Sequence, residues 1–199
     1  GDFVTECFPG QFRNWFYSLL AMSAELEGKA PFKTLLGHAL VKDENGREMH
    51  KSWGNAIWFD DAAEKMGVDV MRWMYSIQNI EQNLLFGYGP ANEVRKKIIT
   101  FWNTYSFFAT YASVDGFKPS GKELNFSSLP ILDKWILAKM HVLIRDAKNY
   151  YDNYRVDQFM KAFDGFLEDS EEYIGVNLDR DKYNKALSSY LEAGMQTYL

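Results

Sequence analysis

The sequence predicts a mainly α-helical protein, in which a helical bundle follows a shorter part that also contains strand. From about residue 90 onward, apolar residues recur every three or four positions over long stretches, as in amphipathic helices. From residue 2 to about residue 79, short apolar runs alternate with turns instead. Hydrophobic residues make up 47% of the 199 residues. This share is enough to bury a substantial core.

The N-terminal part is expected to begin with a helix followed by a strand. Residues 11–29 have helical periodicity, and Gly28 suits the C-terminal cap. The apolar positions that share one helical face are Trp15, Leu19, Met22 and Leu26. Residues 32–43 then contain a short apolar run, which ends before the turn at Asn45 and Gly46. That length, with a turn after it, favours a buried strand.

Two short helices are expected after this strand. The first is predicted to be capped by Asp60 and closed at Gly67, and the second to be capped by Asp69. Residues 113–130 form a polar connection with glycine and proline, which separates two of the long helices of the C-terminal part.

Three long amphipathic helices and a final helix starting near Arg180 are expected to form an antiparallel bundle. The apolar stripe of the first is Val94, Ile98, Phe101, Tyr105 and Phe108. That of the second is Leu132, Ile136, Met140, Leu143 and Ala147. That of the third is Phe159, Phe163, Phe166 and Ile174.

Composition excludes several kinds of site. The net charge of -5 argues against indiscriminate nucleic-acid coating, although a local basic face remains compatible with it. The one cysteine, Cys7, excludes an internal disulfide and a multi-cysteine zinc site, and it is either a small core residue or a reactive thiol. No apolar run reaches transmembrane length, so we expect a cytoplasmic protein that does not bind membranes. We also expect it to be a monomer.

Residues 42–55, which read KDENGREMHKSWGN, form a polar run between the strand and the next helix. Taken alone, this run is either a plain connection or a loop that handles phosphate. It resembles the Lys-Met-Ser-Lys-Ser signature loop of class I aminoacyl-tRNA synthetases, although Glu48 and His50 replace the first lysine and the first serine. The residues that match are Met49, Lys51, Ser52, Gly54 and Asn55.

The resemblance implies roles for the matching residues of this loop. Lys51 and Ser52 would be catalytic, and Lys51, Met49 and Asn55 would bind ATP. Negative charge develops as pyrophosphate leaves, and a mobile cationic loop can stabilise that charge.

The segment upstream of the loop is similar to a conserved-motif segment of isoleucyl-tRNA synthetases. Matching residues are Gln11, Arg13, Trp15 and Phe16. The similarity implies that Glu6, Gln11 and Trp15 contact the aminoacyl-adenylate, with Trp15 shaping the aliphatic pocket. The alternative for Trp15 is a core position on its amphipathic helix.

The segment downstream resembles the anticodon-binding bundle shared by isoleucyl, valyl and leucyl enzymes. Matching residues are Asp133, Trp135, Ile136, Leu137, Asn153 and Tyr154. The resemblance divides the chain into the end of a Rossmann-like catalytic domain (residues 1–58), a linking helical segment (59–88) and a truncated anticodon-binding bundle (89–199). The basic residues implied in tRNA binding are Arg95, Lys96, Lys97 and Lys134, with a solvated helix face as the alternative.

The implied reaction is ATP-dependent activation of isoleucine, with Mg²⁺ accompanying ATP, followed by transfer to tRNA(Ile). No structural metal is expected. The His-Ile-Gly-His signature is absent, because the histidines are scattered at His38, His50 and His141. We therefore expect a fragment that is inactive alone. The alternatives are a valyl- or leucyl-type fragment, a stand-alone tRNA- or protein-binding module without catalysis, and a helical interaction protein.

Overall fold

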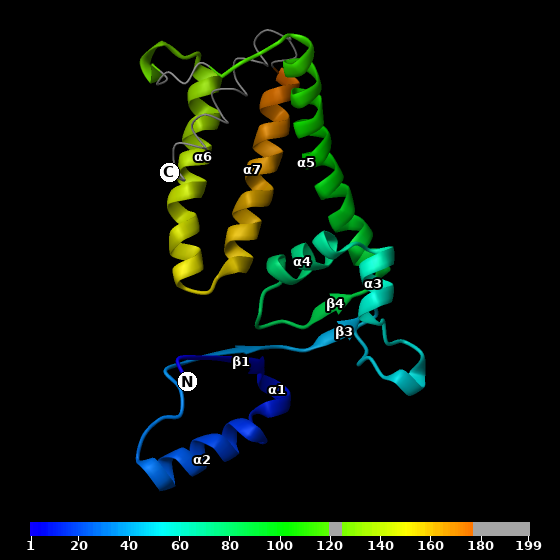
Figure 1. Cartoon of the computed structure of the whole chain (residues 1–199), viewed down its shortest axis with the longest axis vertical. Coiled ribbons are helices and arrows are strands. Elements are labelled where there is room, and N and C mark those ends of the chain that lie inside the picture. Colours follow the sequence, from blue (N-terminus) through cyan, green and yellow to red (C-terminus); the bar gives the residue numbers. More distant parts are fainter. Residues whose placement is uncertain (120–124, 177–199) are drawn as a thin grey trace. The chain divides into compact units, whose positions relative to one another are not determined.

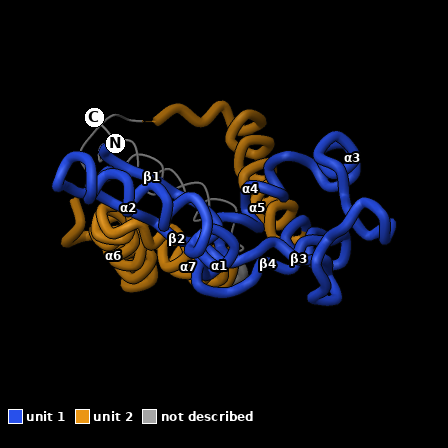
Figure 2. The backbone as a smooth tube through the Cα atoms, turned by 90° about the horizontal axis from the view of Figure 1, so that it is seen from below, with its two compact units in different colours: residues 1–95 blue, residues 96–199 orange. Residues whose placement is uncertain are grey.

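The computed structural model describes residues 1–119 and 125–176, and the chain forms two compact units, residues 1–95 and 96–199 (Figure 2). Unit 1 contains β1 (Phe3–Cys7), α1 (Phe8–Gln11), α2 (Trp15–Glu27), β2 (Thr34–His38), β3 (Val41–Asp43), the 3₁₀ turn η1 (Lys51–Trp53), α3 (Phe59–Lys65), α4 (Val68–Ile77) and β4 (Leu84–Phe86). Helix α5 (Tyr88–Val114) begins in unit 1 and ends in unit 2, where η2 (Phe126–Ser128), α6 (Ile131–Asp152) and α7 (Val156–Val176) follow. The predominance of helix confirms the predicted class.

Unit 1 contains two pairs of parallel strands (Figure 1). β1 pairs with β2, from Phe3 opposite Thr34 to Cys7 opposite His38, and α1 and α2 lie between them in the chain. β3 pairs with β4, and the loop of residues 44–58, α3 and α4 lie between these two strands in the chain. Parallel strands need a crossover connection of this kind. The arrangement is that of an α/β domain.

The apolar run expected to be one strand forms two, because its middle pairs elsewhere. The backbone N–H of Ala39 donates to the carbonyl of Ile80 at 2.8 Å, and that of Leu40 donates to the side chain of Asn83 at 3.1 Å. The carbonyl of Leu40 in turn accepts from the N–H of Leu84 at 2.9 Å. β3 therefore leaves β2 and joins β4, a strand that the sequence did not predict.

The expected caps of the two short helices were wrong by one or two positions. Trp58 is the N-cap of α3 and Gly67 that of α4, while Asp60 and Asp69 lie inside the first turns. Acidic side chains in a first turn interact favourably with the positive end of the helix dipole. They therefore mark the helix start without capping it. α3 ends at Lys65 with Met66 as its C-cap, and the next residue, Gly67, has a φ of 93° and is also the N-cap of α4.

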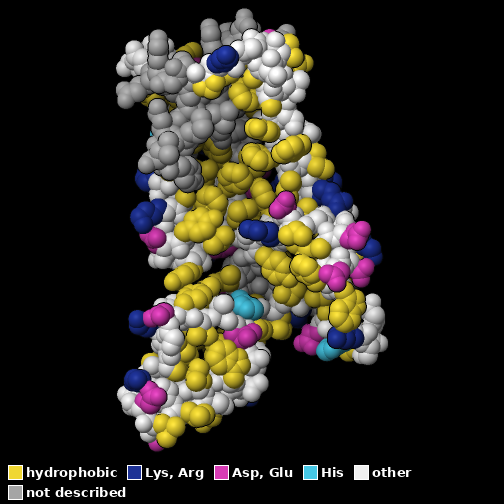
Figure 3. Space-filling view, viewed as in Figure 1, with side chains coloured by type: hydrophobic (Ala, Val, Ile, Leu, Met, Phe, Trp, Pro, Cys, Tyr) yellow, Lys and Arg dark blue, Asp and Glu magenta, His cyan; other side chains and the backbone are white. Residues whose placement is uncertain are grey.

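The predicted core stripe of α2 is largely exposed, although the cap at Gly28 is confirmed. Met22 is 60% and Leu26 78% exposed, and the one buried residue of this helix is Phe16. The exposed face and residues 29–33 line an open cavity of about 980 Å³. Figure 3 shows apolar side chains at the surface in this region. Periodicity located the helix but not the face that is covered.

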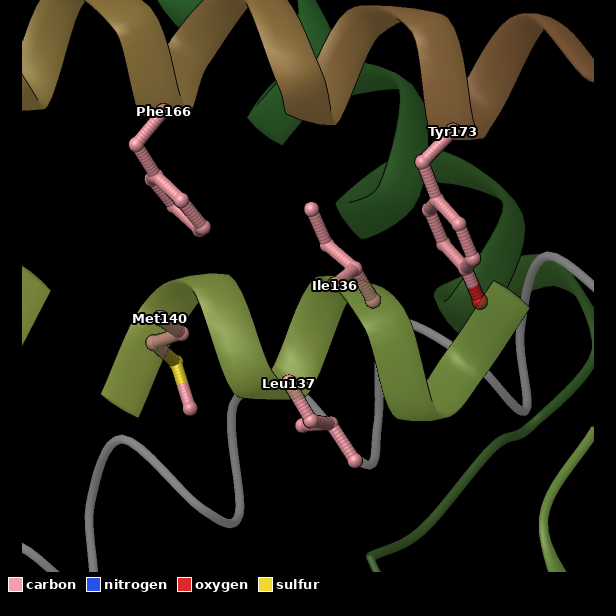
Figure 4. Packing of buried hydrophobic residues seen from close by; sticks show 5 residues of the cluster. All are labelled: Ile136, Leu137, Met140, Phe166 and Tyr173. Carbon is pink, nitrogen blue, oxygen red and sulfur yellow. The ribbon is translucent and has the colours of Figure 1, made fainter. Parts of the chain in front are cut away.

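In unit 2, α6 and α7 form a helical hairpin with an apolar interface. Its buried cluster is Ile136, Leu137, Met140, Phe166 and Tyr173. Phe166 and Tyr173 point from α7 toward α6, and Ile136 points toward α7 (Figure 4). The Tyr173 hydroxyl donates to Asp133 Oδ1 at 2.7 Å, so this polar atom is paired at the edge of the cluster. The predicted stripes of these helices are confirmed at Ile136, Met140 and Phe166.

The final helix expected from Arg180 lies outside the described residues. Within the described residues, no helix has the combination of length and apolar character that crossing a membrane requires.

The first turn of α7 contains an almost fully buried carboxylate, that of Asp157, which is 2% exposed. It accepts hydrogen bonds from Arg155 Nε at 2.9 Å, Arg155 Nη2 at 3.0 Å and Gln158 Nε2 at 2.9 Å. The Arg155 guanidinium, with help from Gln158, lowers the pKa of Asp157 to about 2. This ion pair therefore ties the turn between α6 and α7 to the first turn of α7.

We predict that Asp157→Asn lowers the free energy of unfolding by about 2.5 kcal/mol at pH 7. A carboxyl pKa near 2 in the folded chain, against the usual 3.8, corresponds to this amount at about 1.4 kcal/mol per pKa unit. Because the folded pKa is the lower one, the contribution is present above about pH 4 and is lost as the pH falls toward about 2. The measurement is urea unfolding of both proteins over this pH range.

The control is Asp152→Asn, which removes the exposed ion pair between Lys148 and Asp152 at the end of α6. This variant should lower the free energy of unfolding by less than about 1 kcal/mol. If the difference in the free energy of unfolding between wild type and Asp157→Asn did not change with pH, the buried ion pair would not be its cause.

Candidate functional site

The loop after β3 is organised around the carboxylate of Asp43, which is 7% exposed. Its Oδ1 accepts the backbone N–H of Asn45 at 3.0 Å and of Arg47 at 2.8 Å. The N–H of Gly46 donates to the carbonyl of Asp43 at 2.9 Å, which closes the turn expected at Asn45 and Gly46. An aspartate that binds backbone N–H groups two and four residues onward stabilises such a turn.

The loop returns to Asp43 at Asn55. Asn55 Nδ2 donates to Asp43 Oδ2 and to the carbonyl of Glu48, both at 2.9 Å. Its Oδ1 accepts the backbone N–H of His50 at 3.0 Å. The Asn55 amide and the Arg47 N–H hold the pKa of Asp43 below its usual range, so this carboxyl is ionised at neutral pH. The Asn55 side chain thus connects the end of the loop with Asp43 at its start and with the backbone of Glu48 and His50 in its middle.

Lys51 lies in the exposed part of the loop, at the start of η1. Gly54 closes this turn with a φ of 71°, which a residue with a side chain rarely adopts, and its N–H donates to the Lys51 carbonyl at 3.2 Å. The Lys51 ammonium lies 4.6 Å from the centre of the exposed Trp58 ring. Such a cation–π contact is weak at an exposed site, so it costs little for the lysine to leave the Trp58 ring.

The other residues of the motif surround Lys51. Ser52 is exposed, Met49 is partly buried, and the His50 ring lies 4.2 Å from the Trp53 ring. Glu48, which stands where the family has a lysine, lies 3.3 Å from His50 Nε2. Glu48 therefore has a local partner and adds no positive charge to the loop.

A cavity of about 350 Å³ lies behind the loop, bounded by the loop, α3, β4 and the start of α5. Glu44 Oε2 accepts the N–H of Gly89 at 3.0 Å at the first turn of α5. A Cβ at Gly87 would lie 2.6 Å from the Glu44 side chain, so this close approach requires glycine. Among the described residues, no group of three or more metal-ligating side chains converges.

The residues expected around the aminoacyl-adenylate lie near each other in the chain, from the end of β1 to the start of α2. Glu6 is partly buried, and its Oε1 accepts the N–H of Cys7 at 2.8 Å. Gln11 Oε1 is buried, and within the described residues it has no hydrogen-bond partner. Trp15 is partly buried, with its ring 4.1 Å from that of Phe16.

The basic residues expected to bind tRNA already have partners in the structure. Arg95 Nη2 donates to the carbonyls of Lys65 at 2.5 Å and Met66 at 2.8 Å, the end of α3. Lys97 forms an ion pair with Asp164. Lys134 donates to the Ser127 carbonyl at 3.0 Å, and Lys96 is exposed. On the face drawn in Figure 3, basic and acidic side chains are interspersed.

Comparison with known proteins identifies the family. Residues 2–85 match the family described as tRNA synthetases class I (I, L, M and V). The chain is 34% identical over 185 residues to the isoleucine–tRNA ligase of Porphyromonas gingivalis, an alignment that covers 92% of the chain. It is 35% identical over 187 residues to that of Cytophaga hutchinsonii, again over 92% of the chain. The chain belongs to the class I aminoacyl-tRNA synthetases.

These synthetases are much longer than the chain, which spans 16% of the Porphyromonas gingivalis enzyme and 17% of the Cytophaga hutchinsonii enzyme. A solved relative in fold is a LeuRS of Agrobacterium radiobacter K84, in a ternary complex with tRNA and LeuAMS. The two share a TM-score of 0.73 at 14% identity, over 96% of this chain and 25% of the LeuRS chain. This similarity concerns the fold.

Sequence reasoning missed Asp43, although the family motif located the loop. The available signal was local: an aspartate two residues before Asn-Gly is typical of a side-chain-stabilised turn. Its pairing with Asn55, twelve residues onward, is a tertiary contact that the local pattern does not contain.

We predict that Arg95→Ala destabilises unit 1, because it leaves the last carbonyls of α3 without their donors. The free energy of unfolding should fall by about 1.5–3 kcal/mol, the scale for hydrogen bonds that involve a charged group. Denaturant unfolding followed by tryptophan fluorescence measures this loss. Arg72→Ala, at an exposed arginine of α4, is the matched control and should change stability by less than about 0.5 kcal/mol. Equal stability of the two variants would show that the contact with α3 is incidental.

Proposed function

We propose that the chain is part of an isoleucyl-tRNA synthetase, which activates isoleucine with ATP and transfers it to tRNA(Ile). The observation that carries this proposal is the 34–35% identity to isoleucine–tRNA ligases over 92% of the chain, across both compact units. In this proposal unit 1 supplies the signature loop and unit 2 supplies helices of the anticodon-binding bundle.

The proposed chemistry of the loop rests on the position and charge of Lys51. Activation joins the carboxylate of isoleucine to the α-phosphate of ATP and releases pyrophosphate, with negative charge developing on the leaving group. The exposed ammonium of Lys51, on a turn between fixed ends, suits the stabilisation of that charge. Ser52 and Met49 flank it, and Mg²⁺ would accompany the phosphates of ATP.

Specificity for isoleucine is proposed from the relatives, with the leucyl and valyl types as alternatives. The LeuRS fold covers nearly the whole chain, so the fold is compatible with either type. Trp15 is the residue of this chain proposed to shape the aliphatic pocket, from its position at the start of α2.

Binding of tRNA by unit 2 is proposed to be weak when this chain acts alone. The basic side chains are mostly engaged by carboxylates or backbone carbonyls, as for Lys97 and Lys134. Phosphate contacts require such cations to exchange partners. We therefore propose that the described part of unit 2 makes only a handful of phosphate contacts.

In a synthetase that contains this segment, we predict that Lys51→Ala lowers the rate of isoleucine-dependent ATP–pyrophosphate exchange about 10²- to 10³-fold. This is the scale for losing one oriented donor to the transition state. The affinity for isoleucine should change little, because the lysine acts on phosphates. Arg47→Ala, four positions earlier on the same loop, is the control and should retain most of the activity. An unchanged rate for Lys51→Ala would place this lysine among ordinary surface residues.

For the 199-residue chain alone, we predict weak tRNA binding, with a slope of log K against log salt of about -2 to -4. Lys96→Glu together with Lys134→Glu should weaken binding and flatten the slope by somewhat under one unit for each lost phosphate contact. Lys118→Glu makes the same charge change at an exposed position of unit 2 outside the proposed set, and should leave the slope unaltered. The measurement is a titration of labelled tRNA(Ile) across a salt series. Identical slopes for the wild type and the double variant would mean that these lysines are only a solvated surface.

A further inference from the structure

Two side chains at opposite ends of the signature loop are bonded to each other. Asp43 ends β3 and Asn55 follows the last turn of the loop, and Asn55 Nδ2 donates to Asp43 Oδ2 at 2.9 Å. We name this pair the clasp. Asp43 is 7% exposed and Asn55 is partly buried, so the clasp lies at the base of the loop, whereas Lys51 lies in its exposed part.

The hydrogen-bonding capacity of Asn55 is largely used within the loop. An asparagine amide has two N–H donors and one carbonyl acceptor. Asn55 gives its donors to Asp43 and to the carbonyl of Glu48, and its acceptor takes the N–H of His50. A donation from Asn55 to a phosphate of ATP would therefore have to break one of these bonds. This geometry points away from the direct ATP contact that the family motif implies for Asn55.

We propose that Asp43 and Asn55 are positioning residues, which hold the loop at a fixed place relative to β3 so that Lys51 meets the phosphates of ATP. The part of this proposal that concerns catalysis rests on the proposed function. The backbone at Glu48 and at His50, which flanks Lys51, is held by Asn55, and Asn55 is held by the ionised carboxylate of Asp43. Hydrogen bonds to a charged acceptor are about twice as strong as neutral ones. Small misplacements of a reacting group can cost about 10²-fold in rate.

The clasp itself is tested on the 199-residue chain by limited trypsin digestion, because Arg47 and Lys51 are cleavage sites inside the loop. Asn55→Ala should raise the rate of cleavage after Lys51 about 10- to 100-fold, the scale of losing a charge-assisted hydrogen bond. Asp43→Ala and the double variant should give a similar increase, because the two residues act as a unit. Cleavage after Lys33, which lies outside the loop, serves as the internal reference.

The matched control is Asn83→Ala, which removes another asparagine of unit 1 that accepts a backbone N–H, that of Leu40 at 3.1 Å. Loop cleavage should stay at the wild-type rate in this variant. Because Asp43→Ala empties a buried position, Asp43→Asn provides a second variant of the same size. Its single side-chain oxygen cannot accept from Asn55 and from the backbone N–H groups of Asn45 and Arg47 together, because these bind opposite oxygens of Asp43, so this variant should also raise the rate of cleavage after Lys51. Wild-type cleavage rates in Asn55→Ala, or additive effects of the two alanine variants, would overturn the clasp.

The role in catalysis is tested in a synthetase that contains this segment. Asn55→Ala should lower kcat of isoleucine-dependent ATP–pyrophosphate exchange about 10- to 100-fold and leave the KM for isoleucine within about twofold, since the loop acts on phosphates. Asp43→Asn should lower kcat in the same way and leave the KM for isoleucine within about twofold, a split that a merely destabilised fold would not give. An unchanged kcat in Asn55→Ala would overturn the positioning role. A wild-type enzyme without isoleucine-dependent exchange would contradict the proposed function instead, and the digestion would still decide whether the clasp holds the loop.

Discussion

A carboxylate removed from water must be paired, and at the end of β3 the pairing of Asp43 determines the path of the next twelve residues. Its three N–H donors come from Asn45, Arg47 and Asn55, so the chain has to turn sharply and later return to the same point. The return brings the amide of Asn55 against the backbone of Glu48 and His50, just before Lys51. The exposed loop that carries Lys51 is thereby fixed at its base, where Asp43 and Asn55 are hydrogen-bonded.

The base in turn depends on contacts between segments that are distant in sequence. β3 is placed by its parallel pairing with β4, which follows α3 and α4 in the chain. Glu44, next to Asp43, accepts the N–H of Gly89, and Gly87 has no side chain that would obstruct it. Arg95 of α5 donates to the end of α3. Hydrogen bonds therefore connect the first turns of α5 with the loop and with α3 within unit 1.

The sequence predicted the elements whose pattern is local, and it failed where the structure depends on a distant partner. The stripes of α6 and α7 located Ile136 and Phe166 correctly, because a helix repeats one face along its own length. β4 is three residues long and has no period to detect, and the break between β2 and β3 depends on bonds to residues 80–84. In the loop, the resemblance singled out Lys51 and Asn55 for roles that stay predictions, whereas the hydrogen-bond partner of Asn55 became evident only in the structure.

We propose that this segment belongs to an enzyme that activates isoleucine. The most direct measurement is ATP–pyrophosphate exchange by a synthetase that contains this segment, with isoleucine, valine and leucine compared at equal concentrations. We expect exchange that depends on isoleucine and a kcat/KM for valine about 10- to 200-fold lower, the discrimination that one missing methylene group allows. Exchange that prefers leucine or valine, or no exchange with any of the three, would contradict this proposal.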